Sequence, residues 1–141
     1  MTREEKLALL EKARAARAYA YAPYSGFAVG AALLCADGRV FTGCNIESAA
    51  FAPTQCAERT ALGKAVSEGA RSFAAIAVVG AKQGCDGGPI SPCGVCRQML
   101  AEFSDGGLTV LMGGTRAGDG DFTERTLEQL LPMSFGAGDM R

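Results

Sequence analysis

Residues 73–79, FAAIAVV, form an almost wholly apolar run near the middle of the chain. A strand of this composition is typical of a sheet that is covered on both faces. Outward from it, residues 27–34 and 108–112 form two further apolar strands, one on each side along the sequence. These three runs predict the centre of a β-sheet with helices packed on both of its faces.

Four helices are expected around this sheet, and three of them carry a start signal. Thr2 with Glu5 and Thr126 with Gln129 form capping boxes, and Thr54 is a candidate N-cap. The expected helices cover residues 3–20, 54–68 and 93–103, and a short segment that starts after Thr126 and is closed by Pro132.

Two more strands complete the pattern. Asp37-Gly38 predicts a two-residue hairpin turn between residues 27–34 and a returning strand over 40–46. Residues 122–125 read as a short edge strand, and no repeat or linker interrupts the order of elements. We therefore expect residues 1–141 to form a single α/β domain.

The composition restricts the possible partners and chemistry. The chain has 141 residues, and 14 Lys+Arg against 15 Asp+Glu give a net charge of −1, which argues against a nucleic acid as partner. No apolar stretch approaches the ~18 residues of a membrane span, and residues 1–20 lack the apolar core of a signal peptide. A cytoplasmic location with reduced thiols is therefore expected. The chain has no histidine, which excludes Ser-His-Asp and Cys-His catalysis and imidazole metal ligands.

The six cysteines are the remaining candidates for metal chemistry, at positions 35, 44, 56, 85, 93 and 96. Because strand-helix-strand crossovers keep their strands parallel, the helices that start near Thr54 and Cys93 begin at the same sheet edge. Cys56, Cys93 and Cys96 lie in those first turns, where the helix dipole favours thiolates. Three thiolates around zinc leave a fourth position for water, as in catalytic sites. Glu58 is the candidate proton carrier, provided that the site lies at the helix end.

The cysteines also allow other interpretations. Cys93-x-x-Cys96 could be a redox pair, which would leave the third cysteine and Glu58 unexplained. Cys85, in a glycine-rich loop, is a candidate fourth ligand of a purely structural zinc site. Cys35 and Cys44 lie on expected strands and are interpreted as small buried hydrophobic residues.

Polar and aromatic residues near the expected site are ambiguous on pattern alone. Alternation along a strand places Asn45 and Glu47 on one face, where they could hold a ribose, although polar residues on strands are more often simply solvated. Aromatic side chains most often lie in the hydrophobic core, so this is the position expected for Phe27, Phe51 and Phe135.

Two segments decide between these interpretations: Cys56-Ala57-Glu58-Arg59 and Pro92-Cys93-Gly94-Val95-Cys96. Together they resemble the signature of zinc-dependent nucleoside deaminases. Over nearly its whole length, the chain resembles the small homotetrameric cytidine deaminases. The further matching segments are Tyr24-Ser25-x-Phe27-x-Val29-Gly30-Ala31-Ala32, Gly43-Cys44-Asn45-Ile46-Glu47, Ala65-Val66-Ser67-Glu68-Gly69, Ser91-Pro92 and Leu130-Leu131-Pro132.

The resemblance implies a three-layer α/β/α fold with a mixed five-stranded sheet. It also implies one Zn²⁺ per subunit, held by Cys56, Cys93 and Cys96, with Glu58 as the catalytic proton carrier. Arg59 is expected to support the thiolate charge. The substrate-binding residues that it implies are Phe27, Asn45, Glu47, Ala57 and, from a neighbouring subunit, Phe135. Ser48 departs from the pattern, because the family commonly has an asparagine there.

The implied reaction is the hydrolytic deamination of cytidine and 2′-deoxycytidine to uridine and 2′-deoxyuridine plus ammonia, a step of pyrimidine salvage. Zinc lowers the pKa of a bound water from 15.7 towards ~7. A free nucleoside fits better than a nucleotide, because Glu47 would repel a phosphate. The alternatives are a deaminase of a modified cytosine nucleoside and a structural zinc module without chemistry. Residues 134–139 are expected to form neither helix nor strand and to lie on a neighbour in a homotetramer with shared active sites.

Overall fold

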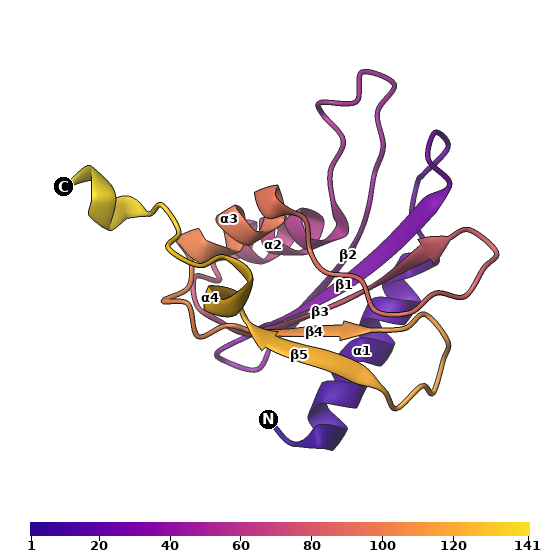
Figure 1. The fold of residues 1–141 in the computed structure, drawn as a ribbon, viewed down its shortest axis with the longest axis horizontal. Coiled ribbons are helices and arrows are strands. Elements are labelled where there is room, and N and C mark those ends of the chain that lie inside the picture. Colours follow the sequence, from indigo (N-terminus) through magenta and orange to yellow (C-terminus); the bar gives the residue numbers. More distant parts are fainter.

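The computed structural model describes all residues from Met1 to Arg141 and contains one five-stranded sheet (Figure 1). The elements, in chain order, are α1 (Arg3–Arg17), β1 (Phe27–Cys35), β2 (Val40–Cys44), α2 (Ala57–Ser67), β3 (Phe73–Lys82), α3 (Gly94–Glu102), β4 (Thr109–Gly113), β5 (Phe122–Thr126), α4 (Leu127–Leu130) and a final 3₁₀ helix (Ala137–Met140). All the expected helices and strands are therefore present. None of the helices has both the length and the apolar character needed to cross a membrane.

The sheet is mixed, with the strand order β2-β1-β3-β4-β5. β1 pairs antiparallel with both β2 and β3, whereas β3 and β4 are parallel and β4 and β5 antiparallel. β2 and β3 consequently run in the same direction with β1 between them. Because α2 follows β2 and α3 follows β3, both helices start at the same edge of the sheet, as the crossover argument predicts.

Helices cover both faces of the sheet, which gives the expected three layers (Figure 1). Alternation along β3 explains how one strand serves both faces, since Ile76 and Val78 belong to the core beneath α2 and α3, while Ala75, Ala77 and Val79 belong to the core beneath α1. The small side chains on this face of the sheet let α1 pack closely against the strands. A Cβ at Gly30 would lie 2.0 Å from the carbonyl oxygen of Ala13, so only glycine permits this contact.

Several element boundaries differ from the sequence expectation. α1 ends at Arg17 and β2 at Cys44, each earlier than predicted. The expected cap at Thr54 is wrong: α2 starts after Cys56, and the Thr54 hydroxyl instead accepts a hydrogen bond from the Ser48 amide at 3.1 Å. Both predicted capping boxes are present, at α1 and at α4.

Two turns also depart from the prediction. The Cys35 amide donates to the Arg39 carbonyl at 2.8 Å, so the β1–β2 hairpin has a three-residue loop rather than a two-residue one, and Gly38 takes its left-handed position at φ +95°. The C-terminal segment, expected to lack regular structure, forms a short 3₁₀ helix. Its first turn is closed locally, by bonds between the Gly136 amide and the Asp139 carboxylate and between the Asp139 amide and the Gly136 carbonyl.

Candidate active site

Two helix N-termini form the base of the site. Cys56 is the N-cap of α2 and Cys93 the N-cap of α3, both with extended backbone, and neither side chain caps its own helix. Cys96 lies one turn into α3, where it is fully buried. The extended backbone at Cys56 frees its side chain from the helical direction, so Cys56 and Glu58 can face one cavity although they are only two residues apart.

The sulfur atoms of Cys56, Cys93 and Cys96, here called the thiol triad, all lie within 4.8 Å of one another. The Sγ atoms of Cys56 and Cys93 are 3.7 Å apart, and those of Cys93 and Cys96 are 3.4 Å apart. Zinc–sulfur bonds of ~2.3 Å in tetrahedral geometry place neighbouring sulfurs ~3.8 Å apart. The triad therefore fits three of the four positions around a zinc ion.

The other cysteines do not join this cluster. Cys85 is exposed and lies outside the triad, so the structure offers no four-sulfur set for the structural alternative. Cys35 is buried in the core and Cys44 is half-buried, in agreement with their interpretation as small hydrophobic residues. All six thiols are free, so no disulfide competes for the triad.

Hydrogen bonds stabilise the ionised form of Cys56. The Cys96 thiol is the largest contributor, followed by Arg59 and Cys93, and together they lower the pKa of Cys56 to about 5. The pKa of Cys96 is raised, chiefly because its thiol donates to Cys56. Arg59 contacts the same sulfur: its Nη2 is 3.6 Å from the Cys56 Sγ and 3.3 Å from the Thr54 carbonyl oxygen.

Glu58 is the one carboxylate that lines the cavity beside the triad. Its residue is only 4% exposed, and this burial raises the pKa of the carboxyl group above its ordinary value. A raised pKa lies closer to neutral pH, where the carboxyl group can both accept and donate a proton, as an acid–base role requires.

The cavity has a volume of about 220 Å³. It brings together most of the predicted site residues and several that the sequence did not single out. The lining residues are Phe27, Val29, Asn45, Thr54, Gln55, Cys56, Ala57, Glu58, Ile90, Ser91 and Cys93. The sequence pattern does not distinguish the aliphatic lining residues from core residues. For Ser91, the only signal in the sequence is its position directly before Pro92-Cys93.

Asn45 and Glu47 are not solvated strand residues. Both lie just beyond the end of β2, and Asn45 is 8% exposed because its amide bonds to the edge of β1. Its Oδ1 accepts from the Val29 amide at 2.9 Å and its Nδ2 donates to the Phe27 carbonyl at 2.8 Å. Hydrogen bonds from Ser25, first from its hydroxyl and then from its amide, lower the pKa of Glu47, which does not itself line the cavity.

The predicted aromatic residues separate into two groups. Phe27 is half-buried and lines the cavity, whereas Phe51 and Phe135 are 71% and 61% exposed, so the core interpretation is wrong for both. Phe51 instead packs edge-on against Tyr24 with ring centroids 6.2 Å apart.

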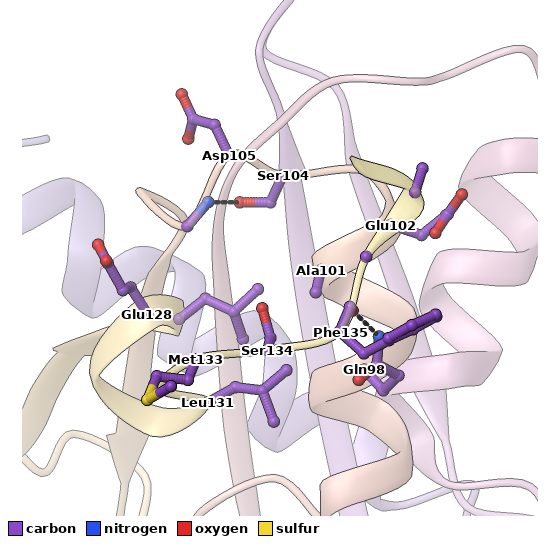
Figure 2. A pocket seen from close by; sticks show the side chains of 14 residues that line it. Gln98, Ala101, Glu102, Ser104, Asp105, Glu128, Leu131, Met133, Ser134 and Phe135 are labelled. Carbon is purple, nitrogen blue, oxygen red and sulfur yellow. Dashed lines mark hydrogen bonds between the residues drawn. The ribbon is translucent and has the colours of Figure 1, made fainter. Parts of the chain in front are cut away.

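Phe135 lies beside Gln98 of α3 (Figure 2). Its carbonyl accepts from Gln98 Nε2 at 2.8 Å, and its residue borders a second cavity of about 420 Å³ between α3, α4 and the C-terminal segment. This cavity shares no lining residue with the thiol-triad cavity. Within one chain, Phe135 is therefore not brought to the site.

Known proteins with related sequences share this arrangement of elements. Residues 3–112 match the family described as "Cytidine and deoxycytidylate deaminase zinc-binding region". The chain belongs to this deaminase family. The matched residues include the complete thiol triad and Glu58 and end before the C-terminal segment with Phe135.

Individual family members are similar over nearly the full length. The cytidine deaminase of Sporosarcina psychrophila is 49% identical over 132 residues, which cover 94% of this chain and 92% of the relative. That of Mycobacterium tuberculosis strain H37Rv is 42% identical over 125 residues, covering 89% and 85%. The crystal structure of cytidine deaminase from Burkholderia pseudomallei superimposes with a TM-score of 0.82 at 48% identity, covering 96% of this chain and all of that one.

Proposed function

We propose that this chain, as a single domain over residues 1–141, hydrolyses cytidine and 2′-deoxycytidine to uridine and 2′-deoxyuridine with release of ammonia. The observation that carries the proposal is the thiol triad, with sulfur separations of 3.4 and 3.7 Å, beside the buried carboxyl of Glu58 in one cavity. Membership of the deaminase family supports the same reaction.

The thiol triad would hold one zinc ion, which supplies Lewis-acid activation of a water molecule at neutral pH. Glu58 takes a proton from the attacking water and delivers it to N3 of the base, and then assists protonation of the departing amine. Because Glu58 is buried, its proton is exchanged with the substrate rather than with bulk solvent. Arg59 offsets the negative charge of the three thiolates through its contact with Cys56.

The sugar is held by polar groups next to β1 and β2. Asn45 uses one N–H and one lone pair on the backbone of β1, which leaves one of each for a ligand. Phe27 and Ala57 border the nucleoside through the cavity wall. Glu47 accepts a hydrogen bond from a sugar hydroxyl. Its negative charge disfavours a 5′-phosphate, so the substrate is the free nucleoside.

We further propose a homotetramer with shared active sites. The C-terminal segment extends away from the body of the subunit (Figure 1), and it exposes three large apolar side chains, those of Met133, Phe135 and Met140. Burial of such side chains against a neighbour removes apolar surface from water. In this arrangement Phe135 reaches the base bound by another subunit. The reduced thiol triad requires a reducing compartment, so we place the enzyme in the cytoplasm.

The proposal is tested by incubating the zinc-loaded chain with cytidine while the absorbance of the base and the released ammonia are followed together. Uridine and ammonia should form in equal amounts, 2′-deoxycytidine should also react, and cytidine 5′-monophosphate should react far more slowly. Chelation of the metal should stop the reaction. Absence of ammonia with a fully zinc-loaded chain would support the structural zinc module and contradict the proposal.

A further inference from the structure

The carboxylate of Glu47 is held by one turn of the preceding loop. Its Oε1 accepts from the backbone amides of Tyr24 and Ser25, each at 3.0 Å, and its Oε2 accepts from the Ser25 hydroxyl. A carboxylate has about four lone-pair sites. With three of them filled from one side, roughly one acceptor site remains, and its direction is fixed by the other three.

The Ser25 hydroxyl does more than donate to Glu47. It also accepts from the Phe27 amide at 2.9 Å, and the Phe27 carbonyl in turn accepts from the Asn45 side chain at 2.8 Å. One hydroxyl therefore links Glu47, which is not among the residues lining the cavity, to Phe27 and Asn45, which line it. Ser25 itself does not line the cavity.

The turn that carries Ser25 is anchored to the end of the central strand. Lys82, the last residue of β3, donates from Nζ to the Ser25 carbonyl at 2.7 Å. The next amide, that of Gln83, donates to the Gly26 carbonyl, also at 2.7 Å. Gly26 adopts φ +68°, a conformation that favours glycine, and so reverses the chain at this anchor. The hydroxyl is thus held in position by the end of the central strand of the sheet.

We propose that Ser25 is a positioning residue that aims the free acceptor site of Glu47 at a ring hydroxyl, 2′ or 3′, of the nucleoside sugar. This inference rests on the proposed function and deepens it. Ser25 acts through Glu47 and touches neither the base nor the triad. Its contribution is therefore limited to substrates that carry the sugar hydroxyl.

The test compares two substrates, cytidine and 2′,3′-dideoxycytidine, on the zinc-loaded enzyme with Ser25 and with Ser25→Ala. Loss of a hydrogen bond to a charged group should lower kcat/KM for cytidine about tenfold, mainly through KM. For the dideoxynucleoside, which lacks the 2′- and 3′-hydroxyls and keeps only the 5′-hydroxyl, kcat/KM should change by less than about twofold. The Ki values of uridine and 2′,3′-dideoxyuridine should show the same selectivity, because both products bind through the same contacts.

Three further variants make the result specific. Ser25→Thr keeps a hydroxyl and should restore most of the activity on cytidine. Ser25→Cys keeps the shape of the side chain but replaces the hydroxyl by a weaker donor. It should therefore lower kcat/KM for cytidine less than Ser25→Ala does, again with little change for the dideoxynucleoside. If Ser25→Ala does not fold, the comparison is made with Ser25→Cys. Ser67→Ala is the matched control, because the Ser67 hydroxyl bonds only to carbonyls of its own helix, at the opposite end of α2 from Cys56.

The outcomes separate the inference from the function on which it rests. An equal loss on both substrates would show that Ser25 only stabilises the loop, and an unchanged KM for cytidine would show that Glu47 needs no positioning; either result overturns the inference alone. If the unaltered, zinc-loaded enzyme fails to deaminate cytidine, the proposed function is overturned and this inference with it.

Discussion

Glu58→Gln removes the proposed proton carrier while leaving its shape almost unchanged. Glu58 is 4% exposed and is the one carboxylate that lines the cavity, so neither bulk water nor another side chain can take over its role. A positioned acid–base group contributes ~10²–10⁴-fold to a rate, which is about 3–5 kcal/mol of transition-state stabilisation. With no substitute in the cavity, we expect kcat to fall by at least ~100-fold.

The assay measures turnover, zinc content and thermal unfolding on the same preparations. Zinc should stay at the unaltered level, because the thiol triad is intact, and the fold should persist. Glu68→Gln is the matched control, since Glu68 is an exposed residue at the other end of α2, and it should retain full activity. Turnover of cytidine by Glu58→Gln within about tenfold of the unaltered enzyme would refute the proton-carrier role.

Further variants address the metal, the assembly and the packing of α2. Replacing any member of the thiol triad by alanine should sharply reduce bound zinc, measured by metal analysis, whereas Cys85→Ala should not; loss of zinc in the Cys85 variant would favour the structural site. Deletion of residues 132–141 should impair activity more than zinc binding and disturb the proposed tetramer in sedimentation experiments, and a fully active monomer would contradict site sharing. Gly43→Ala places a Cβ 2.5 Å from the Ala57 carbonyl oxygen, so it should lower Tm and activity together. Gly63→Ala, which meets no atom within 4 Å, should raise stability by up to ~1 kcal/mol without changing activity, and a loss of activity in it would undermine the packing argument.

The sheet and the thiol triad could be predicted because their signals are local. The apolar run over residues 73–79 is typical of a strand covered on both faces, and it is the central strand β3. The positions of Cys56 and Cys93 near two helix starts, combined with the direction of crossovers, already placed both at one edge of the sheet. The structure adds their actual role as N-caps.

What the sequence could not predict depends on contacts between distant residues. Thr54 is a better N-cap by preference than Cys56, but its hydroxyl accepts from the Ser48 amide in the loop that leads into α2. The polar partners of Glu47 lie 22 and 23 residues earlier in the chain, so no periodicity could place them. Phe51 is exposed because it packs against Tyr24 outside the core, which its residue type does not indicate.

The central claim is that one zinc ion, held by the thiol triad, makes this chain a nucleoside deaminase. Its most direct test is to remove the metal, add zinc back in steps, and measure bound zinc and cytidine turnover on each sample. Activity should be absent without zinc, rise in proportion to the zinc bound, and reach its plateau at one zinc per chain. Full turnover by the zinc-free chain, or one bound zinc per chain without turnover, would contradict the account.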